Sequence, residues 1–314
     1  MKKKLEKRIN LFLSAVIVLI LLPLLLTIFM QRMELSNLIS GMPQGTEEVT
    51  AQIGQENEND AETEARLIGI VAKEISAGSS KEAIMAQCVI ARTNLYAAQK
   101  TGTAEPEALE IEEMEALWGD SFQSVYRRME ECVEHTAGQV LVWKGDYIYA
   151  AYHAISAGQT RDMSELYADS DMPYLTGQIC VDDTAAEGYL AVYYYEESEF
   201  AQRCREYFPE AFSEEVSEEI EVTTRDHAGY VLEIKLGNST CSGEEFRDRF
   251  GLNSACFTVT KLEDQIRIVT KGLGHGFGLS QYSAECMASE GWDYQKILEF
   301  FYPGSEIQAA EKVK

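Results

Sequence analysis

A run of twenty residues without a charge, Leu11–Met30, is the feature that most constrains how this chain can fold. At about 1.5 Å of rise per residue, a helix of this length would span about 30 Å, the thickness of a hydrocarbon core. The run has no polar face, which is atypical of a surface helix in a water-soluble domain. Five of the six charged residues in Met1–Asn10 are basic, and this predicts a cytoplasmic N-terminus. We therefore expect a single-pass membrane anchor with the rest of the chain outside the cell membrane.

A cleaved signal peptide is the alternative interpretation of this run. Signal peptides have a shorter apolar region followed by small residues at an A-x-A-like cleavage site. The apolar run here is long, and Thr27–Ser36 offers no such site, so the sequence favours an uncleaved anchor.

The composition after the run predicts a linker and then one folded domain. Residues 31–62 are rich in Glu, Gln, Asn and Gly and hold few large apolar side chains, so they cannot bury enough surface to fold by themselves. We expect four segments: a cytoplasmic basic tail (1–10), a transmembrane helix (11–30), a flexible acidic linker (31–62) and a catalytic domain (63–308).

The charge balance narrows the choice of partner. The chain has 314 residues, with 52 Asp and Glu against 27 Lys and Arg, and a net charge of -25. A nucleic acid needs clustered positive charge, so we expect no nucleic-acid partner.

The seven cysteines contain no C-x-x-C pair, which argues against a zinc ribbon or finger.

The hydrophobic period changes along the expected domain. Ala65–Ile75 and Ser80–Lys100 have helical spacing, and Ser79 with Glu82 fits a capping box. Gln139–His153 is rich in β-branched and aromatic residues, as strands are, and further strand-like segments follow it. The chain returns to helical spacing near its end. The predicted fold class is α+β, with helices at both ends of the domain and a mainly antiparallel sheet between them.

Three places could carry chemistry. Glu74 ends an apolar helical run, where partial burial would raise the pKa of its carboxyl and suit a general acid. Its local sequence, taken alone, fits an ordinary surface glutamate at a helix end better. Gly272–Tyr282 presents His275 among four glycines, and Tyr152–Asp162 contains His153 without the G-x-S-x-G of a nucleophile elbow. A glycine-rich turn and a hairpin loop are the simpler interpretations of these two segments.

Taken together, the three places resemble the motifs of the SpoIID/LytB family. They occur in the family's order and cover about 65–307. The matching segments are GIVAKEISAGSSKEAIMAQCVIART (Gly69–Thr93), YHAISAGQTRDMSELY (Tyr152–Tyr167) with PYL (Pro173–Leu175), GLGHGFGLSQYSAECMASEGWDYQKILEFFYPG (Gly272–Gly304) and, more weakly, SGEEFRDRFGL (Ser242–Leu252).

The resemblance implies a peptidoglycan lytic transglycosylase, which cuts glycan strands between N-acetylmuramic acid and N-acetylglucosamine. It implies septal wall remodelling during engulfment in sporulation. The expected partners are an amidase that first strips the peptides and a membrane scaffold protein. The expected location is the mother-cell membrane, facing the intermembrane space.

The family's catalytic glutamate falls on Glu74. Arg92, eighteen residues later, is expected to orient Glu74 or a sugar. The other matching positions are expected to line the glycan groove; they are His153, Ser156, His275, Gln281 and Tyr282. No cofactor is expected. Some relatives hold zinc near the second motif with cysteines after the histidine, but Ala154–Ile179 contains no cysteine, so no metal is expected.

A lone acid suits this chemistry. Ordinary glycosidases use two carboxylates because one of them activates water or attacks the sugar. A lytic transglycosylase needs no water, since the 6-hydroxyl of the sugar attacks its own anomeric carbon. The rival interpretation is a glycan-binding amidase enhancer without cutting activity, which the LytB branch of the family represents.

Overall fold

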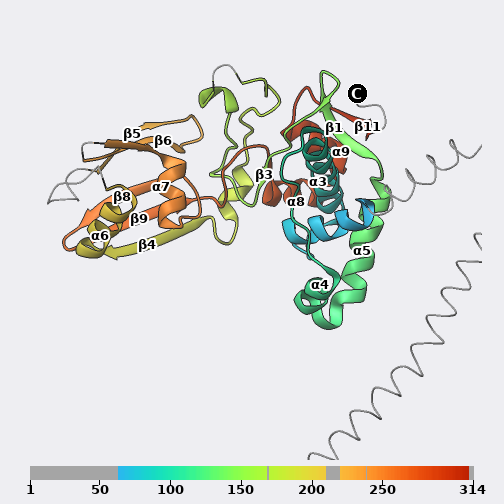
Figure 1. The fold of residues 1–314 in the computed structure, drawn as a ribbon, viewed down its shortest axis with the longest axis horizontal. Coiled ribbons are helices and arrows are strands. Elements are labelled where there is room, and N and C mark those ends of the chain that lie inside the picture. Colours follow the sequence, from blue (N-terminus) through green and yellow to red (C-terminus); the bar gives the residue numbers. More distant parts are fainter. Residues whose placement is uncertain (1–62, 168–169, 210–219, 238, 311–314) are drawn as a thin grey trace, which may run out of the picture. The chain divides into compact units, whose positions relative to one another are not determined.

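The computed structural model describes residues 63–167, 170–209, 220–237 and 239–310. The described residues all belong to one compact unit, Glu62–Lys314 (Figure 1). Residues 63–74 form the first described helix. It is followed by α3 (Lys81–Thr101), α4 (Ile111–Trp118) and α5 (Phe122–His135).

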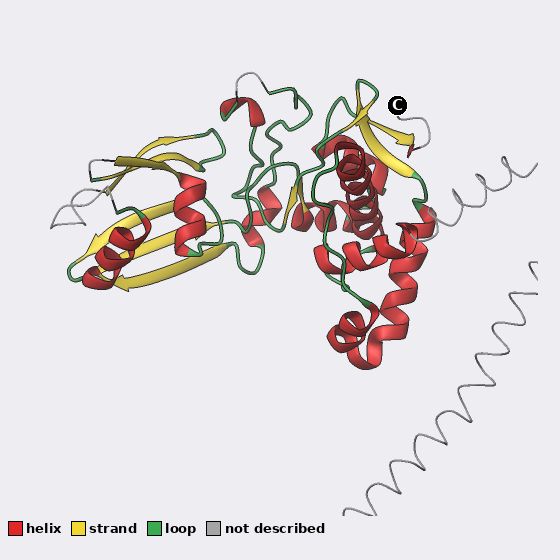
Figure 2. Cartoon of the chain, in the orientation of Figure 1, coloured by secondary structure: helices red, strands yellow, loops and turns green. Residues whose placement is uncertain are grey.

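The described residues of this unit form four small sheets (Figure 2). In the first, β1 (Gln139–Trp143) pairs antiparallel with β2 (Asp146–Tyr147) and with β11 (Glu306–Ala309) from the end of the chain. In the second, β3 (Tyr152–His153) pairs in parallel with β10 (Leu279–Ser280). This short parallel pair brings the second and third sequence motifs side by side.

The other two sheets are antiparallel and come from the middle of the chain. One has the order β4-β9-β8 and the other β5-β6-β7. Helix α6 packs on β4 and β9, and α7 packs on β6 and β7. Their bounds are β4 (Leu190–Glu196), α6 (Glu197–Tyr207), β5 (Ile220–Arg225), β6 (Val231–Leu236), β7 (Ser239–Ser242), α7 (Gly243–Phe250), β8 (Phe257–Leu262) and β9 (Gln265–Lys271).

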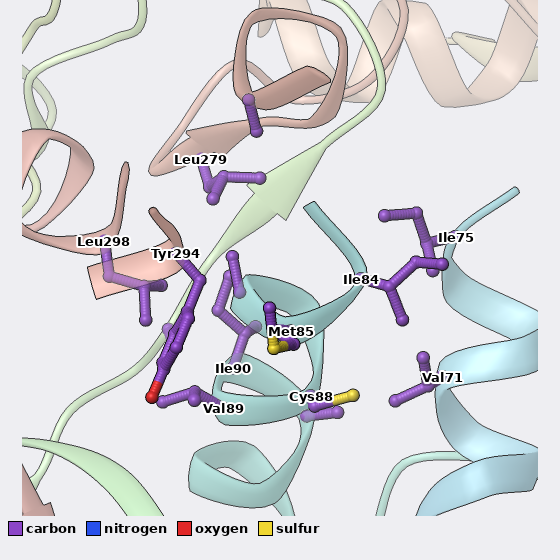
Figure 3. Close-up of a cluster of buried hydrophobic side chains, with 14 of the residues drawn as sticks. Val71, Ile75, Ile84, Met85, Cys88, Val89, Ile90, Leu279, Tyr294 and Leu298 are labelled. Atoms are coloured by element: carbon purple, nitrogen blue, oxygen red, sulfur yellow. The ribbon is translucent and has the colours of Figure 1, made fainter. Parts of the chain in front are cut away.

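Two large apolar clusters form most of the core of the described residues, beside a small third one of Tyr230, Ala255 and Cys256. The larger one surrounds α3, and it also includes side chains of the 63–74 helix, α8 (Gln281–Ser289) and α9 (Tyr294–Phe301). Figure 3 shows Val71 of the first helix facing Cys88 of α3, with Leu298 on the other side of α3. The smaller cluster joins α6 and α7 to the two middle sheets. The 63–74 helix is therefore fixed against α3 by buried apolar contacts.

The cap of α3 differs from the predicted one. Ser80, rather than Ser79, is the N-cap, and its hydroxyl accepts a hydrogen bond from the Ala83 N–H at 3.3 Å. The Glu82 carboxylate accepts from the Tyr294 N–H at 2.8 Å instead of closing a capping box. A contact distant in sequence has replaced the local one, which sequence spacing cannot reveal.

The predicted placement of helices was wrong. The fold is α+β, but helices are not confined to the two ends of the domain and no single sheet lies between them. Helix α6 was missed because charged residues surround the three side chains that it buries, Phe200, Ala201 and Cys204. The strands divide into four sheets because β1 pairs with β11 and β3 pairs with β10, across most of the domain.

The single-pass anchor and the membrane localisation also need correction. Within the described part of the chain, no helix is long and apolar enough to cross a membrane. Helix α3 has 21 residues, but it carries Lys81, Arg92 and Lys100 among other polar side chains. The predicted span Leu11–Met30 lies outside the described residues.

Candidate active site

Glu74 is the last residue of the first helix, and its side chain is half-buried. The carboxylate accepts a hydrogen bond from the Gln87 side-chain amide at 2.8 Å. Burial raises the pKa of Glu74, while hydrogen bonds from Gln87 and Tyr152 partly oppose that shift. Burial is the stronger effect, so this carboxyl holds its proton to a higher pH than an exposed glutamate.

Residues from all three motifs meet at Glu74. Tyr152, on β3, contributes its phenol from the second motif. Gln281, the first residue of α8, belongs to the third motif. Its amide nitrogen donates to the Glu74 carbonyl oxygen at 2.8 Å and to the Gln87 side-chain oxygen at 3.2 Å. Gln87 therefore accepts from Gln281 and donates to Glu74, so Gln281 orients the amide that bonds the carboxylate.

No second carboxylate influences Glu74 within the described residues. The pKa of Glu74 is set by burial, by Gln87 and by Tyr152, and no other acid or base contributes to it. The arrangement fits chemistry that relies on one acid.

The loop after Glu74 is held in place by side chains from other elements. The Arg128 guanidinium donates to the carbonyl oxygens of Ala77, at 3.0 Å, and Ser79. The Ser80 N–H donates to the Glu285 carboxylate at 2.7 Å. These bonds satisfy backbone groups of the loop and tie it to α5 and α8.

His153 and His275 lie beside each other, with ring centroids 5.8 Å apart. Burial lowers the pKa of His153 to about 3, and the neighbouring His275 adds to this effect. Burial also lowers the pKa of His275 to about 4, helped by the positive charges of Arg247 and Arg161. Both rings are neutral at physiological pH. Since neither ring is in the imidazolium form there, neither is suited to act as a general acid.

The two histidines form hydrogen bonds with the backbone of the glycine-rich loop. His153 donates from Nδ1 to the Phe277 carbonyl oxygen at 3.1 Å, and His275 Nδ1 accepts from the Phe277 N–H at 3.1 Å. Gly278 has a φ of 67°, and a Cβ there would overlap the Ala151 carbonyl oxygen. The glycine is thus needed for close approach of the loop to the protein's own backbone at β3.

Ser156 is fully buried and does not face solvent. Its N–H donates to the Asp183 carboxylate at 2.6 Å, and its hydroxyl accepts from the Gly158 N–H at 3.1 Å. The hydroxyls of Ser280 and Ser283 donate to the same Asp183 carboxylate at 2.7 and 2.6 Å. Asp183 thus ties the second motif to the start of α8. Sequence reasoning missed it because nothing in its local sequence distinguishes it from the exposed Asp182.

Arg92 does not reach Glu74. It is fully buried, and its guanidinium makes two hydrogen bonds of 2.8 Å with Glu64, in the first turns of the helix that ends at Glu74. It also donates to the carbonyl oxygens of Val133 and Gln139 at 3.2 and 3.3 Å. Arg92 therefore joins this helix to α5 and β1, and a sugar could not contact it.

Tyr282 is half-buried, and its N–H donates to the Ala154 carbonyl oxygen at 3.1 Å. Of the predicted site residues, the structure therefore brings only Gln281 to Glu74. His153 and His275 lie next to each other on the adjoining loop, and Ser156 is bound to Asp183. Within the described ranges, no group of three or more His, Cys, Asp and Glu side chains is placed to hold a metal ion.

Comparison with known proteins agrees with the motif resemblance. Residues 52–143 match the SpoIID family model, described as stage II sporulation protein. The chain is 28% identical over 263 residues to stage II sporulation protein D of Bacillus subtilis (strain 168), covering 79% of this chain and 75% of the relative. The protein of the same name from Bacillus amyloliquefaciens is 27% identical over 262 residues, covering 79% and 74%.

A third relative carries a different name. The chain is 27% identical over 290 residues to the amidase enhancer of Bacillus subtilis (strain 168), and the match covers 77% of this chain but 40% of that protein. The predicted family resemblance is confirmed: residues 52–143 match the SpoIID family model, and the chain is similar to stage II sporulation protein D over most of its length.

Proposed function

We propose that this protein is a peptidoglycan lytic transglycosylase in sporulation that uses Glu74 as its single catalytic acid and base. The observation that carries the proposal is the setting of Glu74: a half-buried carboxyl with a raised pKa, held by Gln87 and Tyr152, with no second carboxylate acting on it in the described residues. The names of its relatives support a role in sporulation.

The chemistry needs two proton transfers, both of them at the Glu74 carboxyl. Protonated Glu74 gives its proton to the glycosidic oxygen as the bond to the anomeric carbon of N-acetylmuramic acid breaks. The carboxylate then takes the proton of that sugar's 6-hydroxyl as its oxygen bonds to the anomeric carbon. The products are a 1,6-anhydro end and a free 4-hydroxyl, and Glu74 regains its proton. A raised pKa favours the first step because it keeps the acid protonated.

We further propose that the substrate is glycan stripped of its peptides. An amidase would act first, with a scaffold protein of the engulfment machinery as a second partner. The net charge of -25 is consistent with this order because stem peptides add carboxylates to the wall.

Replacing the proposed acid tests this function. Glu74→Gln keeps the size of the side chain and an oxygen that can accept from Gln87, but it cannot donate a proton as an acid. We expect release of 1,6-anhydromuramyl products from peptide-stripped glycan to fall at least a hundredfold, in line with the loss of a general acid. Glu115→Gln, at an exposed position of α4, is the matched control and should retain full activity. Equal release by the Glu74→Gln variant and the control would remove Glu74 from this role.

A glycan-binding amidase enhancer is the second candidate, and the similarity to a protein of that name favours it. The two candidates differ in what the purified protein does alone. An enhancer would release no product without an amidase, whereas a transglycosylase would cleave stripped glycan unaided.

A further inference from the structure

A cavity of about 540 Å³ lies apart from Glu74, at the other end of α3. Its wall combines the last turns of that helix, the segment 103–106 that follows it, the end of β2 and the segment 171–174. Three tyrosines line it: Tyr147, Tyr149 and Tyr174. We call it the tyrosine cavity. Its volume falls within the range of about 300–1,000 Å³ that is usual for small-molecule sites.

A short stretch of chain connects the tyrosine cavity with Glu74. Tyr149 lines the cavity, and Tyr152, three residues later, hydrogen-bonds Glu74. Three residues span at most about 11 Å even when fully extended, so the backbones of Tyr149 and Tyr152 are no further apart than that. The distance is on the scale of a disaccharide.

The connecting stretch is rigidly held. Asn94, itself in the cavity wall, donates to the Ala150 carbonyl oxygen at 3.0 Å and accepts from the Ala150 N–H at 3.1 Å. The Tyr149 N–H donates to the Tyr174 hydroxyl at 3.1 Å. Burial raises the pKa of the Tyr302 phenol, and Tyr149, Glu74 and Tyr174 add to that shift, so the cavity and Glu74 lie within electrostatic range of one side chain.

The charges of the wall determine which ligand it suits. Its charged residues are Glu105 and Asp171, and no Lys or Arg lines it. Glu105 is paired with Arg66, and the largely exposed Asp171 lies 3.9 Å from Lys144. Each carboxylate of the wall already has a cation as its partner and no cation lines the wall itself, which favours a neutral ligand over lactyl groups and stem peptides.

The other wall residues suit a neutral sugar. Tyr149 is 52% exposed, so its ring can lie against the C–H face of a sugar. The hydroxyls of Thr101 and Thr103, 3.0 Å apart, offer hydrogen bonds to sugar hydroxyls. Ala97 and Met172 give apolar surface for the methyl of an acetamido group.

We propose that the tyrosine cavity is a remote subsite that holds an uncharged N-acetylglucosamine unit of the strand bound at Glu74. This inference rests on the proposed function, because it needs a glycan strand at Glu74. It adds a length requirement: a strand must reach from Glu74 to the cavity to gain the extra contacts.

Calorimetric titration tests the subsite without relying on cleavage. The full chain with Glu74→Gln is titrated with neutral N-acetylglucosamine oligomers of increasing length. We expect affinity to rise about tenfold once an oligomer is long enough to reach the cavity, which corresponds to about 1.4 kcal/mol. Adding Tyr149→Ala removes the exposed ring, and adding Ala97→Trp fills the cavity; each should abolish the rise and leave short oligomers unaffected. Tyr194→Ala, on β4 and 59% exposed, is the matched control.

Two results would overturn the proposal: a length-dependent rise that persists in both cavity variants, or tighter cavity binding by cationic, deacetylated oligomers. Thermal melts of each variant establish that it is folded. A failure of the proposed function is distinguishable, since it would appear as undiminished cleavage by Glu74→Gln whatever the titrations give.

Discussion

Two opposing effects determine the pKa of the Glu74 carboxyl. Burial raises its pKa, and the hydrogen bonds from Gln87 and Tyr152 stabilise the charged form and lower the pKa again. As a general acid it must be protonated, so activity should fall as pH rises through the pKa of Glu74 in the enzyme–substrate complex.

Removing the Gln87 hydrogen bond should move this limb of the pH profile. Gln87→Met keeps the length of the side chain but cannot donate to the carboxylate. The charged form loses a stabilising contact, so the pKa of Glu74 rises and the alkaline limb of kcat shifts to higher pH. Tyr152→Phe should shift it in the same direction. A limb that stays in place or moves to lower pH in both variants would contradict this account.

Arg92 shows that a motif residue can serve the fold rather than the chemistry. Arg92→Leu removes the buried donor of the Glu64 carboxylate and of the Val133 and Gln139 carbonyl oxygens, and we expect a loss of about 1.5–3 kcal/mol in the free energy of unfolding. Urea denaturation measures it. Lys73→Met, which removes an exposed ion pair with Glu107, should cost less than about 1 kcal/mol. Similar losses in the two variants would remove the special role given to Arg92.

At the scale of elements, Asp183 joins the second motif to the start of α8. Asp183→Asn weakens bonds to Ser156, Ser280 and Ser283, and we expect it to cost about 1.5–3 kcal/mol of stability. Because Gln281 follows Ser280 directly, activity should also fall at temperatures where the variant is fully folded.

Asp182→Asn is the matched control for this variant, since Asp182 is the exposed neighbour of Asp183. It should change neither stability nor activity. If Asp183→Asn were as active as this control when folded, Asp183 would have no part in positioning Gln281.

The sequence could predict the helix ending at Glu74, helix α3 and the motif that supplies Gln281, since each depends on local spacing. It could not predict that Gln87 would hold the Glu74 carboxylate or that Arg92 would pair with Glu64. Those contacts join residues 13 and 28 positions apart and depend on how two helices pack. The four-sheet arrangement was hidden for the same reason, because pairing between β1 and β11 is fixed only when the whole domain folds.

At the scale of the whole molecule, the net charge of -25 should affect which wall material is cut. Intact wall carries stem-peptide carboxylates, which an acidic protein repels over a Debye length of about 8 Å at physiological salt. We expect faster cleavage of peptide-stripped wall at low salt, with the difference shrinking as salt is added. Digests of both materials, analysed by mass spectrometry across a salt series, measure this. Equal rates at low salt would mean that the charge does not select the substrate.

The most direct test of the central claim is the origin of the oxygen at the new glycan end. Peptide-stripped glycan is digested by the purified protein in water enriched in the heavy isotope of oxygen, and the masses of the products are measured by mass spectrometry. We predict 1,6-anhydromuramyl ends that contain no solvent oxygen, because the sugar's own 6-hydroxyl closes the ring. Reducing ends that carry heavy oxygen would show hydrolysis and would contradict the account.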